Sequence, residues 1–535
     1  MAYLDIAREI AEGHPGVAIH ACWSPGYPVL LSLFLRLFHP NAYWESPLIH
    51  FVNVLIFIGA LACFRLFWGE VLHWHRSMAV RDAQIPGLAF WAIGYAVFSI
   101  ATLNVIRVSM IAPDLLVFTF CCLAGWSALR FRSTPSTGRA LLLGLVLALG
   151  YYAKSPFFPV GIVFVLCACL RWPLSRRVIL LGGLAFITFL IACAPFVTAL
   201  SISKARLTFG DTARLNEAFF IDGVQFYEHW QGGPPGSGMP IHPTRKMSDY
   251  PEIYEFGKKN MGTDPPWFDP TYWYDGINPH VNFRRQAIVF VRNLALQFQI
   301  TMESGAELVC VAVILALLTR YRKPWIERFS QLWFVWMPGI AALTMFALIH
   351  VEPRYLGGWL VLLFAGVICA CSLPADEGTR TAVRCVGIAA LITAGSSVML
   401  QASREAVGID YAASRSSRNP AIAVYLLNNG LRPGDDVALI GNGYMAYWAH
   451  LARLHLVAEI PAGITSRPGH PALDFWESTP QQQQRALQIL ERTGARAVIA
   501  GSQESLAASV PSNVPPPWKK IGETGAYVYF FAANQ

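Results

Sequence analysis

Charged residues are scarce in this sequence. Asp, Glu, Lys and Arg make up only 14% of its 535 residues, whereas soluble domains usually contain about 25%. Hydrophobic residues make up 54% of the chain, and the mean hydropathy is +0.42. This balance predicts an integral membrane protein. The net charge of +8 is not gathered into basic runs, so nucleic acid is not expected as a partner.

Cysteine is nearly absent from the polar stretches of the chain. Ten of the eleven cysteines lie in or beside apolar segments, and only Cys22 falls in a polar one. This distribution predicts neither a disulfide framework nor a zinc site, because apolar cysteines usually serve as small buried hydrophobic residues. Residues 1–13 also lack the apolar stretch of a secretory leader, so the first apolar segment, near Pro47–Phe67, is expected to start membrane insertion.

Ten apolar segments are predicted to span the membrane. A helix needs about 20 apolar residues to cross unassisted, so two short segments in the middle of the series are expected to form a tight hairpin inside a bundle. The predicted spans are 46–68, 86–103, 112–129, 140–153, 156–170, 178–200, 303–319, 329–350, 355–373 and 385–400. The predicted fold class is a polytopic all-α transmembrane bundle of about ten helices, with a large extracytoplasmic loop and a small C-terminal α/β domain.

The distribution of basic residues orients these spans. One alternating set of short loops contains fourteen Lys and Arg residues, and the opposite set contains only Arg107, Lys154 and Arg354. The positive-inside rule places the first set in the cytoplasm. Three regions then share the outer face of the plasma or inner membrane. They are a first outer loop with juxtamembrane helices (1–45), the long loop 201–302 within the transmembrane region 46–400, and the C-terminal domain 401–535.

The C-terminal region alternates between helical and strand patterns, which predicts a partly parallel sheet. The predicted helices are 421–431, 444–454 and 480–493, and the predicted strands are 436–440, 455–460, 495–500 and 526–531. The segment Gly441-Asn442-Gly443 follows a strand but lacks the remaining residues of a dinucleotide-binding fingerprint, so it is interpreted as a turn. The loop 201–302 is rich in aromatic residues, which favours an ordered structure.

The three cations that break the charge rule are candidates for ligand binding. Arg107 precedes Asp114, which opens a predicted span; Lys154 lies at the turn of the short hairpin; and Arg354 follows Glu352. All three meet the same membrane face. Fixed cations at that depth suit a lipid phosphate or pyrophosphate, and the neighbouring acids could act as a general base. The alternative is that each cation only reaches toward lipid headgroups.

Several motifs resemble a known family. The segment Tyr3–Gly13 reads Tyr-Leu-Asp-Ile-Ala-Arg-Glu-Ile-Ala-Glu-Gly, and Trp23–Pro28 reads Trp-Ser-Pro-Gly-Tyr-Pro. Composition alone would make the first of these a helix lying in the membrane interface. Together with Pro113-Asp114, a Gly-x5-Gly-x3-Lys pattern that ends at Lys154, and Glu-Pro-Arg-Tyr at 352–355, the two segments resemble GT-C glycosyltransferases. The resemblance is to the branch of dolichyl-phosphate-mannose protein mannosyltransferases and bacterial aminoarabinose and lipopolysaccharide-core transferases.

This resemblance implies a membrane-bound, inverting glycosyltransferase that takes its sugar from a polyprenyl-phosphate donor. It implies that Lys154 and Arg354 contact the donor phosphate and that Asp114 is a second acidic residue of the catalytic site. Arg107 is added to the phosphate contacts by its place at the same membrane face. The residues that would support this site are Tyr3, Glu352 and Tyr355. The acceptor would be a lipid, glycan or protein of the cell envelope, and no cofactor or metal ion is expected.

The sequence departs from the family pattern at its start. The family carries its main aspartate about four residues before the tyrosine that matches Tyr3, and a transmembrane helix before that, so both would precede Met1. We therefore expect that the true start lies upstream of Met1. The alternative is a natural variant that relies on Asp114, or an inactive homologue. Asp5 lies on the other side of Tyr3 and is not expected to replace this aspartate.

Two further functions stay open at this point. A non-catalytic envelope scaffold or inactive homologue would fit the missing aspartate. A lipid transporter or flippase fits less well, because the sequence shows no internal repeat and its charges lie at span ends rather than at the membrane midplane. For the transferase, the aromatic loop is expected to bind the acceptor, with Trp267 and Trp273 as the candidate residues.

Overall fold

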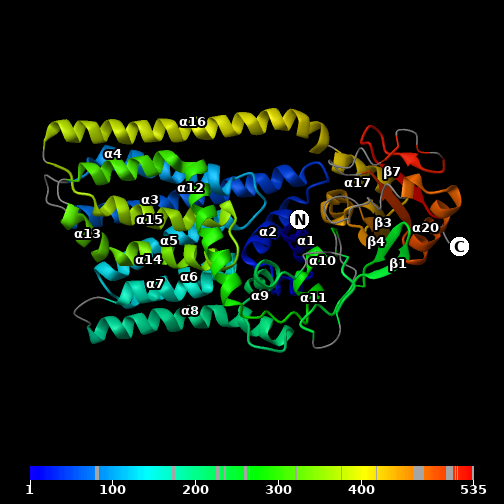
Figure 1. Ribbon diagram of the computed structural model, residues 1–535, viewed down its shortest axis with the longest axis horizontal. Coiled ribbons are helices and arrows are strands. Elements are labelled where there is room, and N and C mark those ends of the chain that lie inside the picture. The colour runs from blue at the N-terminus through cyan, green and yellow to red at the C-terminus, as the bar shows by residue number, and fades with distance from the viewer. Residues whose placement is uncertain are drawn as a thin grey trace.

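Most of the chain is helical, and its apolar helices lie side by side in one bundle in the computed structural model (Figure 1). The structure describes residues 1–78, 84–170, 175–224, 229–233, 237–257, 262–263, 265–319, 322–374, 376–416, 418–461, 475–501, 510–511, 514 and 516–532. Among these residues, seven helices are long and apolar enough to cross a membrane, or eight if one bent pair counts as a single span. The chain is thus a multi-pass membrane protein.

Each of the ten predicted spans corresponds to a helix or a pair of helices. The helices are α3 (Glu45–Met78), α4 (Gly87–Ser99) with the π-helix η3 (Ile100–Ile106), α5 (Asp114–Ser133), α6 (Thr137–Ala153), α7 (Phe157–Cys169), α8 (Arg176–Ser203), α12 (Phe283–Leu318), the bent pair α13 (Arg322–Gln331) and α14 (Trp333–Ile349), α15 (Pro353–Ala370) and α16 (Glu377–Ser416). As predicted, α6 and α7 are shorter than full spans and form a hairpin, with α6 packed between α5 and α8.

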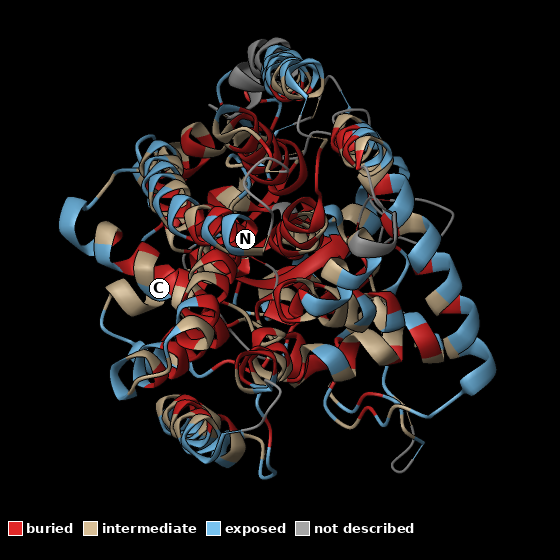
Figure 2. Ribbon diagram, turned by 90° about the vertical axis from the view of Figure 1, so that its left-hand side faces the viewer, coloured by how far each residue is buried: buried red, intermediate tan, exposed pale blue. Residues whose placement is uncertain are grey.

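Local sequence features set the ends and the contacts of these helices. The hydroxyl of Ser136 accepts a hydrogen bond from the Arg139 backbone N–H and caps the start of α6. Pro353 occupies the first turn of α15, where its missing N–H costs no hydrogen bond. A Cβ at Gly144 would lie 2.5 Å from the Ala185 carbonyl oxygen, so this glycine allows α6 and α8 to pack closely. Figure 2 shows that buried residues line the inside of the bundle and exposed residues its outside.

The two predicted sets of charged loops lie at opposite ends of the bundle. Arg76 and Arg130, in the last turns of α3 and α5, belong to the end away from the sheet domain. Of the fourteen loop cations, Arg81, Arg171 and Arg320 lie outside the described residues. The opposite end carries the N-terminal segment, the long loop and the sheet domain (Figure 1).

Short helices at this end come from the first 45 residues and from the long loop. They are α1 (Ala2–Ala11), the 3-10 helix η1 (Pro15–Ala18), α2 (Gly26–Phe38), α9 (Thr212–Glu217), the π-helix η4 (Ala218–Asp222), α10 (Pro265–Phe268) and α11 (Pro270–Trp273). They separate the bundle from the sheet in Figure 1.

The sheet has seven strands among the described residues, in the order β1-β2-β4-β3-β5-β7-β6. The strands are β1 (Arg245–Asp249), β2 (Glu252–Glu255), β3 (Asp436–Gly441), β4 (His455–Pro461), β5 (Ala497–Ala500), β6 (Lys519–Lys520) and β7 (Tyr527–Phe530). The central strand β3 runs parallel to β4 and β5, and the other pairs are antiparallel. The predicted mixed sheet is confirmed, and the long loop adds β1 and β2 to it through the pair Tyr254–Glu459.

Helices cover both faces of this sheet. They are α17 (Arg418–Asn428), α18 (Tyr447–Ala452), which follows the 3-10 turn η5 (Gly443–Met445), and α20 (Pro480–Arg492). Successive residues of a strand point to opposite faces. Val437 and Leu439 therefore join a core with α17, α18 and Trp273, whereas Ala438 and Ile440 join the core beneath α20.

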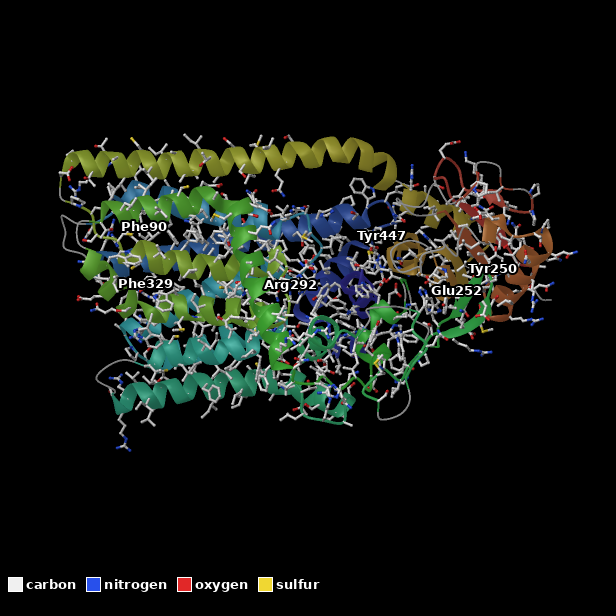
Figure 3. All side chains as sticks on the ribbon, viewed as in Figure 1. Phe90, Tyr250, Glu252, Arg292, Phe329 and Tyr447 are labelled. Carbon is white, nitrogen blue, oxygen red and sulfur yellow. The ribbon has the colours of Figure 1, made fainter. Side chains whose placement is uncertain are left out.

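Two helices run further than predicted. The helix α12 begins at Phe283, inside the predicted loop 201–302, where the Asn282 side chain accepts a hydrogen bond from the Arg285 backbone N–H. Its backbone is non-helical at Gly305, and the part before this break, which includes Arg292, crosses the end of the bundle in Figure 3. The helix α16 continues past residue 400 to Ser416 and connects the bundle to the sheet domain.

Candidate functional site

The centre of the candidate site is Asp114, the first residue of α5. Its side chain is only 4% exposed, and its Oδ1 lies 2.6 Å from the Lys154 Nζ. The other oxygen, Oδ2, accepts no hydrogen bond from the described residues, and it lies 3.8 Å from the Arg354 Nε. One buried acid is thus held between two cations and keeps one oxygen without a hydrogen bond.

Lys154 is placed by the turn of the short hairpin. It is the residue after α6, in an extended conformation, and its backbone N–H still donates to the Gly150 carbonyl. Its ammonium also lies 3.8 Å from the centre of the Tyr355 ring, a geometry in which the ring's negative face attracts a cation. The hairpin that the sequence predicted therefore delivers its lysine to Asp114.

The motif Trp23–Pro28 holds this hairpin turn in place. The Ser24 hydroxyl accepts a hydrogen bond from the Ser155 backbone N–H at 2.9 Å. At Gly26, an added Cβ would lie 2.7 Å from the Tyr152 carbonyl oxygen, so only glycine allows α2 to approach the end of α6 this closely. The motif thus contributes to the site through its packing.

The start of α15 supplies the second cation and a second acid. Arg354 Nε lies 3.7 Å from the Glu352 Oε2, and the His350 Nε2 lies 3.3 Å from the Glu352 Oε1. The hydrogen bond with His350 lowers the pKa of Glu352, as do the charges of Arg354 and Lys154, and partial burial acts in the opposite direction. The Glu-Pro-Arg-Tyr motif therefore surrounds Asp114 with charge-paired groups.

Tyr3 lies beside this group of charges. Its ring makes edge-on contacts with the rings of Trp23 and Tyr27. Burial raises the pKa of Tyr3 well above its ordinary value, and the Asp114 carboxylate and the Tyr355 phenol raise it further. Tyr3 therefore stays protonated at physiological pH and can donate a hydrogen bond near Asp114.

Tyr27 and Asn53 position the loop that leads to Asp114. The Tyr27 hydroxyl donates to the Asn53 Oδ1 at 2.8 Å, and the Asn53 amide donates to the carbonyls of Val108 and Met110. Asn53 is a residue that the sequence analysis did not identify, because a single Asn in an apolar helix gives no sign of its partners.

A cavity of about 130 Å³ opens beside Lys154 and Tyr355. Its wall is mostly apolar, and His350 adds a polar group. The lining residues are Lys154, Ser155, Pro156, Pro159, Phe209, Gly210, Thr212, Ala213, Asn216, Met345, Phe346, Ile349, His350 and Tyr355. The arrangement can accept an anionic group at Lys154 and an apolar chain beside it.

The other predicted site residues lie apart from this group. Arg107 is exposed and forms no ion pair within the part of the chain that the structure describes. Trp267 is half-buried and makes an edge-on contact with Tyr444 of the sheet domain. Trp273 is only 1% exposed and packs in the core of that domain, so a sugar ring cannot reach it in this structure. Of the two proposed acceptor residues, only Trp267 is accessible.

Met1 lies close to the site as well. Burial lowers the pKa of its α-amino group, the Asp5 carboxylate raises it, and the Arg354 guanidinium lowers it. The aspartate that the family pattern places about four residues before Tyr3 stays a prediction. Asp5 itself is directed elsewhere: its carboxylate binds His450 and Thr263. Among the described residues, no group of three or more His, Cys, Asp or Glu side chains could hold a metal ion.

Comparison with known proteins identifies the fold. No protein-family model and no curated protein matches the sequence. The structure of ArnT from Cupriavidus metallidurans in the apo state matches with a TM-score of 0.50 and 12% sequence identity, over 98% of this chain and 92% of that one. The structure of the same protein bound to undecaprenyl phosphate gives the same values.

A tethered complex of the Archaeoglobus fulgidus oligosaccharyltransferase with an acceptor peptide is less similar, with a TM-score of 0.44 and 10% identity over 93% of this chain and 64% of that one. The likeness to ArnT shows that the chain has the fold of GT-C glycosyltransferases, as its motifs predicted.

Proposed function

We propose that this protein is an inverting glycosyltransferase that moves a sugar from a polyprenyl-phosphate donor to a lipid, glycan or protein of the cell envelope. The observation that carries the proposal is the buried Asp114 carboxylate between Lys154 and Arg354, beside a largely apolar cavity. The GT-C fold supports it, and so does the fact that ArnT of this fold has been solved with undecaprenyl phosphate bound. In this proposal the site faces the outer side of the membrane, with loop 201–302 and the C-terminal domain.

The two cations would bind the donor phosphate. Lys154 and Arg354 can each donate charge-assisted hydrogen bonds to phosphate oxygens, and the apolar wall beside Lys154 suits the first part of a prenyl chain. As the bond between the sugar and the phosphate breaks, negative charge grows on the leaving phosphate. Fixed cations stabilise that charge more than they stabilise the intact donor, and this difference accelerates transfer. Arg107 would be a peripheral contact at the same membrane end.

The Asp114 carboxylate would act on the acceptor. None of the described residues donates a hydrogen bond to its Oδ2, which can take the proton of an attacking hydroxyl or amine. The acceptor atom then bonds to the anomeric carbon as the phosphate leaves from the opposite side, which inverts that centre and releases polyprenyl phosphate. Tyr3, Glu352 and Tyr355 would hold the charged groups in place. If an aspartate precedes Tyr3 as the family pattern predicts, it would share this role.

Binding of undecaprenyl phosphate to the full-length protein in lipid nanodiscs tests the donor site. Lys154→Met and Arg354→Ala should each weaken binding at least about tenfold, the usual cost of losing a charge-assisted contact. Arg107→Ala should have a smaller effect. Arg176→Ala, which removes an exposed cation at the other end of the bundle, is the matched control. Equal affinity in all four variants and the wild type would contradict the donor site.

Asp114→Asn separates an enzyme from a scaffold. In an enzyme, this variant should keep undecaprenyl phosphate binding and lose sugar transfer. A wild-type protein that binds the lipid but transfers no sugar would instead support the non-catalytic alternative.

A further inference from the structure

A second group of buried charges lies where the N-terminal helix meets the sheet domain. The side chains of Asp5, Arg8, Glu45 and His450 are all less than 10% exposed. They come from three elements that are far apart in sequence: α1, the first residue of α3, and α18. Buried charges are costly unless they are paired, so the contacts within this cluster decide whether the two regions stay together.

The contacts of this cluster centre on His450. Its Nδ1 lies 2.6 Å from the Asp5 Oδ1, and its Nε2 lies 2.5 Å from the Glu45 Oε1. The Arg8 guanidinium donates to the second oxygen of Glu45. Each of the four side chains therefore contacts another member of the cluster, and none of them is more than 8% exposed.

The loop before α10 is shaped around Asp5. The Thr263 hydroxyl donates to the Asp5 Oδ2 at 2.5 Å. An added Cβ at Gly262 would lie 2.1 Å from the Asp5 Oδ1, and this glycine has φ +94°, which other residues rarely adopt. The Gly262 N–H donates to the Leu454 carbonyl, just after α18. Asp5 is thus enclosed on one side by α18 and on the other by this loop.

The C-terminal end of α1 also contacts the C-terminal end of α18. Beyond the pairs of Asp5 and Arg8, Glu12 forms an ion pair with Arg453 at 3.0 Å. The Tyr447 ring stacks on the His450 ring, and Tyr447 lies where the N-terminal segment meets the sheet domain in Figure 3. The other side of α1 carries Tyr3, which packs on Trp23 and Tyr27 beside Asp114. One short helix therefore connects the sheet domain to the candidate site.

We infer that Asp5 and His450 are positioning residues, through which the C-terminal domain fixes α1 and thereby holds Tyr3 beside Asp114. The inference rests on the proposed function, because it assigns Tyr3 a role in sugar transfer. Neither residue touches the cavity or the cations that would bind the donor phosphate. Loss of the cluster should therefore lower turnover more than it lowers the affinity for the lipid phosphate.

Hydrogen exchange of the full-length protein tests the physical part of this inference without any substrate. His450→Gln removes the ring that contacts both Asp5 and Glu45, and it should speed exchange in residues 2–11 about tenfold, with β3 and β5 unchanged. The matched control is His455→Gln, which removes a histidine that pairs with Asp436 inside the sheet domain. Unchanged exchange in α1 would overturn the inference. Faster exchange in β3 and β5 as well would show that His450 serves only the fold of its own domain, which also overturns it.

A milder variant covers the case in which His450→Gln does not fold. Glu12→Gln breaks the partly exposed pair with Arg453 and leaves the buried cluster intact. It should speed exchange at the end of α1 by a smaller factor, about twofold. No change in this variant, together with misfolding of His450→Gln, would count against the inference.

Kinetics then test the link to the site. His450→Gln should lower kcat about tenfold, because a small displacement of a supporting group is enough to slow a positioned reaction, and its affinity for undecaprenyl phosphate should change less than about twofold. Equal kcat in the variant and the wild type would overturn the positioning role. A wild-type protein with no transfer activity would instead contradict the proposed function, and the exchange result would still stand.

Discussion

Removal of the Lys154 ammonium is the most informative single change at the candidate site. Lys154→Met keeps most of the side chain's length and apolar contacts, and it leaves the Asp114 carboxylate without its closest cation. The two groups lie 2.6 Å apart with side-chain exposures of 17% and 4%, so the carboxylate that remains is still largely buried. The variant should therefore be destabilised as well as defective in lipid binding.

The size of this effect follows from burial. Breaking a buried pair from one side usually costs about 3–5 kcal/mol, because a charge remains without compensation. Here Arg354 stays 3.8 Å from the other oxygen of Asp114 and offsets part of that cost. We expect a loss of about 2–3 kcal/mol in the free energy of unfolding. Asp114→Asn combined with Lys154→Met should recover at least about 1.5 kcal/mol of it, since the buried charge is then absent.

Unfolding of the purified protein in mixed detergent micelles measures these free energies. Lys246→Met is the matched control, because Lys246 forms ion pairs with Asp249 and Glu252 at the surface of the sheet domain, and Asp249 is almost fully exposed. Such pairs contribute about 0.2–1 kcal/mol. Additive effects of the two site variants, within about 0.5 kcal/mol, would refute the buried pair.

Three other expectations concern residues in and around the site. The hydrogen bond with His350 lowers the pKa of Glu352, so Glu352 stabilises the fold above its unfolded pKa of about 4.3, and this stabilisation is lost as pH falls through the lower folded pKa. The Tm difference between the wild type and Glu352→Gln should therefore be present at pH 7 and vanish in stronger acid. A Tm difference independent of pH would contradict this. Burial raises the pKa of Cys22 to about 12, so little of this thiol is in the reactive thiolate form at pH 8. Iodoacetamide labelling at pH 8, followed by mass spectrometry, should be more than about 100-fold slower than for a free thiol. Labelling at the free-thiol rate would argue against burial. Trp273→Ala should lower the free energy of unfolding by about 3–5 kcal/mol in denaturation experiments. Trp267→Ala should instead weaken acceptor use in transfer kinetics, with little loss of stability. A stable Trp273→Ala, or a Trp267→Ala with unchanged acceptor use, would be evidence against these assignments.

The bundle and the proximity of Asp114, Lys154 and Arg354 could be predicted from the sequence because their signals are local. Apolar segments of sufficient length mark the spans, and the break between 140–153 and 156–170 places Lys154 at a turn. The charge asymmetry between loops set Lys154 and Arg354 at the same membrane end as Asp114. The structure adds the distances, which no pattern in the sequence contains.

Other features depend on contacts between distant segments. Asp5 and His450 are 445 residues apart. The polar side of α1 was expected to lie in the membrane interface, because nothing in residues 1–13 indicates that a domain more than 400 residues later covers it. Prediction from pattern could not supply this pairing.

Prediction from polarity also missed parts of two helices and two of the strands. The predicted spans stopped where charged and polar residues begin, but α12 and α16 continue, because residues such as Gln and Arg are good helix formers outside a membrane. The strands β1 and β2 are short and lie toward one edge of the sheet. Their sequences, Arg-Lys-Met-Ser-Asp and Glu-Ile-Tyr-Glu, show too little apolar alternation to mark them as strands.

Turnover of a polyprenyl-phosphate-linked sugar tests the central claim most directly. The full-length protein would be incubated in membranes that contain the cell's own lipid-linked sugars and envelope acceptors, and mass spectrometry would follow the release of free polyprenyl phosphate. We expect release by the wild-type protein and by Arg176→Ala, and none by Asp114→Asn. Lipid-linked sugars that stay intact with the wild-type protein, or release that is equally fast with Asp114→Asn, would contradict it.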